Sequence, residues 1–441
     1  MISRVDMDRN LYWSSSGPVT AEQIRNRVSA LSEKLPDLDA AALSFGRRDC
    51  FLTALLSVWS RGQTAVLPAK STAYNPKYSR CQFSSLYFLS DNPCAISEAE
   101  NSLIDSTLAE GLGKPSQIEF DPKMKALCMF TSGSTGRPVP NFKTCESLIN
   151  SAVPIAAMVG LDRLESLSLV ATVPIDHMYG FELTALMVLW AGLSAHCERP
   201  IYPDDIARCL RQIPAPRVLV TTPFHLRILM ESEVKLPALH KVISATAPLS
   251  AEFATRLEDW LCAPIQEIYG FTEGGSVASR RTVDNLDWTL RSDLTPDEFD
   301  GQQFLISRDT EQRIPFPDSI RILDNSHIQL ESRHQDIVKI AGKRESLSNL
   351  SSLLAQIDGV KDGIYAMSSD DSGMGTITRL IAIVVAPGVT DQKIRQSLRK
   401  NTDDVFLPRK IYRVPSLPRN ETGKLPHEDL QTLISAVLKR A

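Results

Sequence analysis

An apolar run passes directly into a loop of hydroxyls and glycines in the stretch Met129-Phe130-Thr131-Ser132-Gly133-Ser134-Thr135-Gly136-Arg137-Pro138. The run from Ala126 to Phe130 predicts a buried strand, and the glycines after it allow backbone N–H groups to turn inward as an anion nest. Four hydroxyls add donors for phosphate oxygens. The loop lacks the Gly-Lys-[Ser/Thr] of a Walker loop, which argues against ordinary NTPase chemistry. Taken alone, such a loop is also compatible with a simple turn.

The composition leaves small molecules and proteins as the main partners. The chain has 441 residues, of which 43% are hydrophobic, so it can bury a large core and has room for about two to four domains. Its formal net charge is −4, which gives no reason to expect nucleic acid or an anionic membrane surface as the main partner.

The ends and the apolar stretches of the chain predict a cytoplasmic protein without membrane insertion. Residues Met1 to Trp13 mix acids and bases without an apolar core, unlike a secretory signal. The uncharged stretch from Leu183 to Cys197 is too short to span a bilayer and predicts a buried helix. Eight cysteines without a CxxC pair predict reduced thiols, with Cys128 and Cys209 buried, and neither disulfides nor zinc.

Strand and helix patterns alternate along the chain, which indicates an α/β architecture. The segment Thr20-Ala21-Glu22-Gln23 has the form of a capping box, and apolar residues then recur at helical spacing, so a helix is expected over residues 20–35. Further apolar runs are each followed by polar or turn residues and a helical pattern. These runs are residues 167–173, 217–221, 241–245 and 264–269.

Three more segments follow the hydroxyl loop in a fixed order. They are Tyr269-Gly270-Phe271-Thr272-Glu273, Arg333-His334-Gln335-Asp336-Ile337-Val338-Lys339-Ile340-Ala341-Gly342-Lys343-Arg344, and Asn420-Glu421-Thr422-Gly423-Lys424. Together with the loop they resemble the core motifs of the adenylate-forming superfamily, which holds acyl- and aryl-CoA synthetases, peptide-synthetase adenylation domains and luciferases. The resemblance extends from about residue 40 to the C-terminus.

Within this superfamily, three segments look most like the ligases of aryl-polyene and xanthomonadin pigment clusters. They are Pro174-Ile175-Asp176-His177-Met178-Tyr179-Gly180, Ala341-Gly342-Lys343-Arg344 and Leu417-Pro418-Arg419-Asn420. This likeness implies a flat aromatic acid as substrate, such as a hydroxybenzoate or hydroxycinnamate.

The resemblance implies two domains. The first, residues 1–334, is an AMP-binding core that is shorter at its N-terminal side than in typical members, and the second, residues 335–441, is a small mobile α+β lid with its hinge at Gln335. The strand-like segment 380–385 and the helical segment 391–400 suit such a lid.

The implied reaction joins a carboxylate to the α-phosphate of ATP, so cations and oriented dipoles must stabilise the developing charge. Lys424 is implied as the catalytic lysine, Thr272 as a contact of the α-phosphate and Glu273 as the ligand of Mg²⁺. Adenine would lie against Tyr269, with Glu267 accepting from its exocyclic amine and residues 244–248 on its other face. The implied nucleotide-binding residues are Thr131, Ser132, Gly133, Ser134, Thr135, Gly136, Ala245, Glu267, Tyr269, Gly270, Asp318, which would bind the ribose hydroxyls, and Arg333.

The resemblance also implies an acyl pocket and a thiol channel. His177 would guard the substrate carboxylate, and Met178, Tyr179, Gly180 and Ala247 would line the pocket. After rotation of the lid, a pantetheine tunnel would form from Lys339, Ala341 and Gly342. The acceptor is the phosphopantetheine thiol of an acyl carrier protein or CoA, with the carrier protein favoured.

One departure from the family pattern weakens the phosphate loop. Val139 stands where the loop usually ends in lysine, and Arg137 or Lys143 is the candidate for the lost charge. Three hypotheses therefore remain: an ATP-dependent acid–thiol ligase, a non-catalytic module that binds nucleotide or carrier protein, and a luciferase-like oxygenase, which would consume oxygen. The retained Glu273 and Lys424 favour the ligase.

Overall fold

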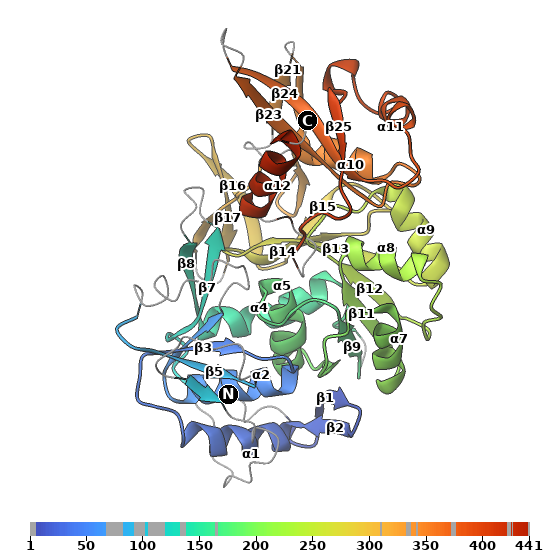
Figure 1. Ribbon diagram of the computed structural model, residues 1–441. Helices are drawn as coiled ribbons and strands as arrows, with labels where there is room; N and C mark the ends of the chain where they lie inside the picture. Colours follow the sequence, from blue (N-terminus) through green and yellow to red (C-terminus); the bar gives the residue numbers. More distant parts are fainter. Residues whose placement is uncertain are drawn as a thin grey trace.

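The protein is described here by a computed structural model (Figure 1). The described residues are 6–67, 83–91, 102–104, 120–132, 138–163, 166–308, 311–331, 337–340, 343–371, 376–420, 425 and 427–439. Across these ranges the α/β class is confirmed, and the larger part of the structure is formed by residues up to 331.

An eleven-stranded mixed sheet forms the centre of the larger part. Its middle strands run parallel, from β1 through β10, β9, β11 and β12 to β13, and the strands at the β19 edge are antiparallel. In spatial order the strands are β19 (Ile320–Ile322), β20 (His327–Leu330), β15 (Trp288–Leu290), β14 (Gly275–Arg280), β13 (Ile265–Phe271), β12 (Lys241–Ser244), β11 (Arg217–Thr221), β9 (Ser168–Ala171), β10 (Ser194–His196), β1 (Asn10–Ser14) and β2 (Gly17–Thr20).

Helices follow the parallel strands β10, β11 and β12, and each of these three helices begins at a strong start signal. Thr222 accepts a hydrogen bond from the N–H of His225 at the start of one helix, and Ser250 accepts one from Phe253 at the next. A third helix begins at Pro203, where the missing N–H costs nothing. These helices are α7 (Pro203–Gln212), α8 (Pro223–Glu231) and α9 (Ala251–Leu261). The four strands expected from the apolar runs are therefore confirmed.

A six-stranded sheet carries the strand that was predicted before the phosphate loop. Its order is β6 (Ser102–Ile104), β5 (Leu86–Ser90), β3 (Ala40–Ser44), β4 (Thr64–Leu67), β7 (Lys125–Ser132) and β8 (Pro138–Thr144). The strand β7 contains the predicted run 126–130 and pairs antiparallel with β8. Helix α2 (Arg48–Ser60) packs on β3 and β4, and α1 packs on α2.

Helix α1 (Ala21–Ser32) confirms the capping box. Thr20 accepts from the N–H of Gln23, and the Gln23 side chain accepts from the N–H of Thr20. The helix ends before Leu35, which is nevertheless buried at 6% exposure, so the apolar periodicity extends slightly beyond the helix.

The prediction of one helix from Leu183 to Cys197 is wrong in part. After α4 (Cys145–Met158), a short helix α5 (Met178–Phe181) continues as the π-helix η3 (Glu182–Leu186) and then as α6 (Met187–Trp190). Gly192 then takes φ of +80°, which ends the helix and allows residues 194–196 to join the large sheet as β10.

The smaller part of the structure is formed by residues from 337 onward. A three-stranded sheet holds β23 (Asp362–Asp371), β24 (Thr376–Val385) and β25 (Lys410–Arg413), beside the hairpin of β21 (Ile337–Ile340) and β22 (Lys343–Ser346). Its helices are α10 (Leu347–Ala355), α11 (Asp391–Leu398), the 3-10 turn η5 (Asp404–Phe406) and α12 (His427–Lys439). The expected strand 380–385 and helix 391–400 are confirmed within β24 and α11.

The two parts have separate hydrophobic cores, and the smaller part lies above the larger one in Figure 1. The core clusters contain residues either up to Leu330 or from Val338 onward. Among the described residues, a hydrogen bond joins the parts: Nη1 of Arg227, in α8, donates to the carbonyl of Lys361 at 3.2 Å. A third small sheet, β16 (Leu294–Phe299), β17 (Gln302–Ser307) and β18 (Arg313–Pro315), belongs to the larger part.

None of the described helices is both long enough and apolar enough to cross a membrane. The six cysteines in the described ranges are free thiols, and Cys128 and Cys209 are fully buried, as predicted.

Candidate active site

A tight turn between β13 and β14 presents two of the predicted site residues. Strand β13 ends at Phe271, whose carbonyl accepts from the N–H of Gly274 at 3.1 Å. Thr272 and Glu273 lie between them and are partly buried. Their side chains make no hydrogen bond or ion pair with the described part of the chain. A hydroxyl and a carboxylate are therefore available to a ligand at the carboxyl end of a sheet strand, where open α/β sheets bind ligands.

Glycines at both sides of this turn allow the hairpin to close. A Cβ atom at Gly270 would lie 2.5 Å from the carbonyl oxygen of Gly275 on the paired strand. Gly275 itself has φ of +70°, and a Cβ there would lie 2.3 Å from Oε1 of Glu182. The role of Gly270 is thus explained by close backbone approach, and its predicted nucleotide contact stays a prediction.

Tyr269 and Asp318, predicted separately as nucleotide-binding residues, lie together. The Tyr269 hydroxyl donates to Oδ2 of Asp318 at 2.8 Å. The tyrosine ring packs near Phe271 and Trp288, with ring centroids 6.0 and 5.8 Å away. Asp318 is 9% exposed, so its carboxylate and the Tyr269 hydroxyl form their hydrogen bond at a position largely shielded from solvent.

Glu267, predicted to accept from the exocyclic amine of adenine, also accepts hydrogen bonds from three protein donors. Oε1 accepts from the N–H of Leu249 at 2.9 Å, and Oε2 accepts from Nε of Arg280 at 2.9 Å and from the hydroxyl of Thr282. The residue is only 2% exposed. These bonds join Glu267 on β13 to β14 and to the segment before α9, and its predicted adenine contact stays a prediction.

In the predicted pocket segment, Met178, Tyr179 and Gly180 are buried and His177 is partly buried. Tyr179 is 5% exposed and donates to the carbonyls of Ile243 and Thr221 at 2.9 and 3.2 Å. A Cβ atom at Gly180 would lie 2.0 Å from the carbonyl oxygen of Pro174. The Tyr179 hydroxyl thus joins the ends of β11 and β12, and Gly180 gives room for the turn into α5, while their predicted places in the acyl pocket stay predictions.

The remaining pocket residues are compatible with the prediction. His177 is partly buried at the N-cap position of α5, and Met178 is 6% exposed. Ala245 is buried at 6% exposure at the end of β12, whereas Ala247 is exposed. Between them Thr246 has φ of +81°, a conformation that a β-branched residue rarely takes and that is concentrated at functional sites. Nothing in the sequence marks this strain.

Lys143 reaches the turn from the six-stranded sheet. It lies on β8, and its ammonium donates to the carbonyl of Glu273. Burial lowers the pKa of Lys143 to about 8, while the nearby Glu182 and Glu273 act to raise it and Arg291 acts to lower it. The structure thus brings one of the two candidates for the missing cation to the Glu273 turn.

Glu182 is a site residue that the sequence reasoning missed. It is 3% exposed, and both carboxylate oxygens accept from the N–H of Ser276 at 3.1 Å. The Ser276 hydroxyl also donates to it. Burial raises the pKa of Glu182, and the hydrogen bonds from Ser276 oppose this rise. The available signal was an acid placed between Phe181 and Leu183 in an otherwise uncharged run.

Several predicted residues lie outside the described ranges, so their assignments stay predictions. Thr131 and Ser132 end β7, and Lys339 lies in β21, where only the backbone is described. The residues outside the described ranges are Gly133, Ser134, Thr135, Gly136, Arg137, Arg333, Gln335, Ala341, Gly342 and Lys424.

A metal or cofactor would find little protein coordination here. Among the described residues, no group of three or more His, Cys, Asp or Glu side chains is placed to hold a metal ion. The single available carboxylate of Glu273 suits Mg²⁺, which usually takes one or two carboxylates together with substrate phosphates and water.

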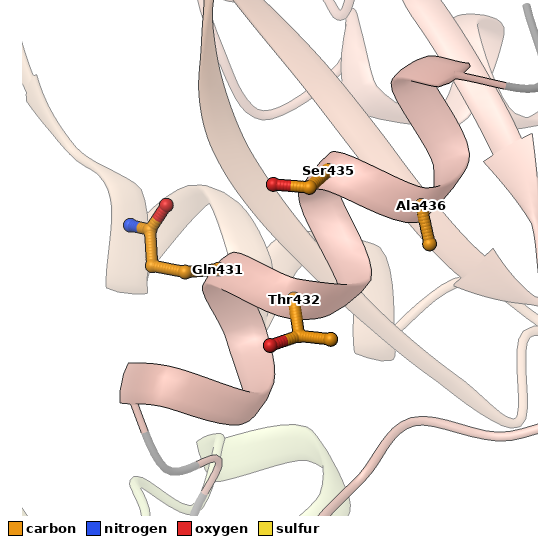
Figure 2. A pocket seen from close by; sticks show the side chains of 4 residues that line it. All are labelled: Gln431, Thr432, Ser435 and Ala436. Carbon is orange, nitrogen blue, oxygen red and sulfur yellow. The ribbon is translucent and has the colours of Figure 1, made fainter.

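A surface depression on the smaller part is distinct from this site. Figure 2 shows it on α12, lined by Gln431, Thr432, Ser435 and Ala436. These side chains are small or uncharged and include none of the candidate residues. We therefore do not include the depression in the site.

The comparison with known families explains the arrangement of the turn, the tyrosine and the phosphate strand. Residues 35–301 match the model of the family described as AMP-binding enzyme. The chain belongs to this family. The match covers the whole six-stranded sheet and the β13–β14 turn, and it confirms the resemblance to the adenylate-forming superfamily.

Two curated relatives of this family member are ligases. The chain is 26% identical over 306 residues to a 4-coumarate–CoA ligase of Cereibacter sphaeroides, covering 67% of this chain and 69% of the relative. It is 21% identical over 354 residues to a 2-succinylbenzoate–CoA ligase of Staphylococcus epidermidis, covering 72% of each chain. Family and relatives confirm the expected enzyme class, an AMP-forming acid–thiol ligase.

Solved structures of the family share the fold along almost the whole chain. The O-succinylbenzoate coenzyme A synthetase of Bacillus subtilis, in complex with ATP and magnesium ion, has a TM-score of 0.79 and covers 98% of both chains at 15% identity. This likeness confirms the expected architecture, a large N-terminal domain and a smaller C-terminal domain.

Proposed function

We propose that this family member activates an aromatic carboxylic acid with ATP and transfers the acyl group to a pantetheine thiol. The observation that carries the proposal is the set of side chains at the carboxyl end of β13, in the large sheet. There Thr272 and Glu273 lie three and four residues after Tyr269, whose hydroxyl donates to Asp318. A nucleotide bound at this edge would meet the ring of Tyr269, the carboxylate of Asp318 as an acceptor for the ribose, and the hydroxyl of Thr272 as a phosphate contact.

In the first half-reaction the substrate carboxylate attacks the α-phosphate of ATP. A bond forms between a carboxylate oxygen and that phosphorus, the bond to the bridging oxygen of the β-phosphate breaks, and pyrophosphate leaves with the electron pair. Thr272 is assigned to the α-phosphate and Asp318 to the ribose hydroxyls. Lys424 is assigned to the transition state, by resemblance. Bound Mg²⁺, held by Glu273, neutralises phosphate charge.

In the second half-reaction the thiol sulfur attacks the acyl carbonyl and AMP leaves as the phosphate anion. The thiol belongs to CoA or to the phosphopantetheine of an acyl carrier protein. The names of the two ligase relatives favour CoA, whereas the resemblance to pigment-cluster ligases favours a carrier protein. The segment containing Lys339, Ala341 and Gly342 is assigned to the pantetheine tunnel.

The acid is proposed to be aromatic, of the hydroxybenzoate or hydroxycinnamate kind. The 4-coumarate and 2-succinylbenzoate relatives act on acids that contain a benzene ring, which supports this class. The buried Met178 and the partly buried His177 provide an apolar wall and a polar edge for such a ring. His177 is assigned to the substrate carboxylate.

The lid is proposed to begin at residue 335, with its hinge at Gln335. The separation of the core clusters between Leu330 and Val338 supports a boundary in this interval. Residues 1–334 then form the AMP-binding domain and residues 335–441 the lid.

Val139 gives a reason to keep a second function open. Its side chain is 50% exposed on β8 at the position where the family usually has lysine. A protein that binds nucleotide or carrier protein without turning over would tolerate such a loss. The retained acids and the presence of Lys143 at the turn favour the enzyme.

The test is pyrophosphate release from ATP with a panel of aromatic and fatty acids, with and without CoA or a phosphopantetheinyl carrier protein. Release that depends on one acid class, and that Lys424→Ala reduces about 10²–10³-fold, supports the ligase. Stimulation by one acceptor identifies the thiol. ATP binding without release for any acid supports the binding module instead.

A further inference from the structure

Lys143 has unused hydrogen-bonding capacity at the Glu273 turn. An ammonium group carries three donors, and the hydrogen bond to the Glu273 carbonyl uses one of them. Within the described part of the chain its ammonium forms no ion pair. A partly buried positive charge with two donors left is costly unless an anion is present for part of the protein's working cycle.

The strand places this charge on one definite side. Side chains alternate along β8, so Lys143 lies on the same face as Val139, and Phe142 lies on the other. The ring of Phe142 packs edge-on against Phe83, at 5.9 Å between centroids, and Lys125 lies over it. The Phe142 face thus belongs to the core, and the Lys143 face is directed to the Glu273 turn.

Charged residues fix the turn on both of its sides. Lys143 holds the carbonyl of Glu273, and Glu182 holds the N–H and hydroxyl of Ser276 after the turn. Nη1 of Arg291 donates to the carbonyl of Ser276 at 2.8 Å, and Asp293 pairs with the same guanidinium at 2.6 Å. Glu182 anchors the turn through Ser276, and among the described residues it forms no ion pair with Lys143.

We propose that Lys143 is the cation that this protein presents to the phosphates of ATP, in place of the lysine that is missing at position 139. The two positions are about 13 Å apart along β8, at roughly 3.3 Å per residue. Lys143 therefore meets the phosphates from the side of the Glu273 turn, and a lysine at 139 would meet them from the side of the loop. The inference rests on the proposed use of ATP at this turn.

The proposal is tested with four variants: Lys143→Met, Lys143→Arg, Val139→Lys combined with Lys143→Met, and the control Lys241→Met. The control removes a lysine that also donates to backbone carbonyls, but at the amino end of β12, away from the turn. The measurements are the KM for ATP in acid-dependent pyrophosphate exchange, the Kd for ATP–Mg²⁺ by calorimetry without acid, and the melting temperature.

We expect Lys143→Met to raise the Kd and the KM for ATP about 10- to 100-fold, the usual effect of losing a hydrogen bond to a charged group. Lys143→Arg should retain ATP binding within about threefold, because the charge is kept. Adding Val139→Lys to Lys143→Met should recover most of the lost affinity. Lys241→Met should leave the Kd and KM unchanged.

Two results would overturn the proposal. One is a Lys143→Met protein that melts at a lower temperature but binds ATP as the wild type does, which would make Lys143 a support of the turn only. The other is weakened binding that Lys143→Arg does not retain and Val139→Lys does not repair. If Lys143→Met does not fold, the single variants Lys143→Arg and Val139→Lys decide. Val139→Lys should lower the Kd for ATP at least threefold, and an unchanged Kd in this variant would contradict the proposal. Calorimetry distinguishes these outcomes from failure of the proposed ligase function. In that case the wild-type protein would bind ATP measurably but show no pyrophosphate exchange.

Discussion

Two partly buried lysines, Lys241 at the start of β12 and Lys143 on β8, illustrate two uses of the same side chain. Lys241 begins β12 and donates to the carbonyls of Val159 and Gly160 at 2.7 and 3.4 Å, just after α4 ends. Lys143 donates to one carbonyl, in the turn that follows β13. Burial lowers the pKa of both lysines.

The two lysines differ in the part of the structure that supplies the carbonyls to which they donate. The carbonyls at a helix C-terminus lack partners and carry partial negative charge, so a lysine there completes the helix. The carbonyl of Glu273 belongs to a turn whose Thr272 and Glu273 side chains have no bond within the described part of the chain. The comparison teaches that burial and a depressed pKa do not by themselves distinguish a structural lysine from one that binds a ligand.

The largest expected effect in this comparison comes from Glu273. Glu273→Gln keeps the turn and the carbonyl that Lys143 contacts, but removes the charge assigned to Mg²⁺. We expect pyrophosphate exchange to fall about 10²–10³-fold, the scale for loss of a transition-state electrostatic group. The Mg²⁺ concentration for half-maximal rate should rise while the melting temperature is preserved. Wild-type exchange in the variant would remove Glu273 from the site.

The second effect is a pH dependence carried by Lys143 and absent from Lys241. The pKa of Lys143 in the free protein is about 8, below its ordinary value of 10.5, and nearby phosphates would raise it. The ammonium is therefore lost from the free protein as pH rises through 8 but kept in the ATP complex. The KM for ATP should rise up to about tenfold per pH unit above pH 8, since binding then takes up a proton.

The groups that face this ammonium are Glu273 in the turn, Glu182 in η3 and Arg291 after β15. None of them replaces the phosphate as a partner, so Lys143→Arg should abolish the rise because arginine stays protonated. A pH profile unchanged by Lys143→Arg contradicts the assignment.

The third effect concerns Tyr269 on β13, the residue assigned to the adenine ring. Tyr269→Phe keeps the ring beside Trp288 but removes the hydroxyl that donates to Asp318 at 2.8 Å. We expect the KM for ATP to rise about three- to tenfold, the scale of one hydrogen bond, because Asp318 loses its orientation. Phe271→Leu, at a neighbouring ring that lacks a hydroxyl, is the matched control for packing. An equal change of KM in both variants would assign the effect to packing.

The smallest effect on activity is expected for Lys241→Met. Loss of the ammonium at the end of α4 should lower the free energy of unfolding by about 1 kcal/mol, since a helix C-terminus loses its cation and hydrogen bond. The KM for ATP should not change. Denaturant unfolding measures the first quantity, and pyrophosphate exchange the second. A raised KM at unchanged stability would remove the distinction between the two lysines.

The local elements were predictable because their signals lie within a few residues of each other. The capping box at Thr20 and the apolar runs that became β9, β11, β12 and β13 are examples. The helix expected from Leu183 to Cys197 was wrong after Trp190, because an apolar run does not distinguish a buried helix from a buried strand. Gly192 was the local signal for the break.

The candidate site was predicted in its residue types but less well in their contacts. Thr272, Glu273, Tyr269 and Asp318 were named from motifs, and the structure places the last two in a direct hydrogen bond. Glu267 was named in the same way, and its bonds to Leu249, Arg280 and Thr282 were not predicted. A motif gives the position of a side chain along a strand, whereas its partners depend on the neighbouring strands.

Short motifs in the sequence were enough to identify the family and to name Thr272 and Glu273, and periodicity and caps were enough to predict several strands and helices. Only the tertiary structure decided that Lys143 meets Glu273, 130 residues away, and that Glu182 meets Ser276, 94 residues away. Such contacts depend on the register of two sheets and on the path of the π-helix η3. Interactions between residues close in sequence do not determine either of these. Burial then gave those charges their chemistry, since the same lysine on an exposed strand would be a solvated cation.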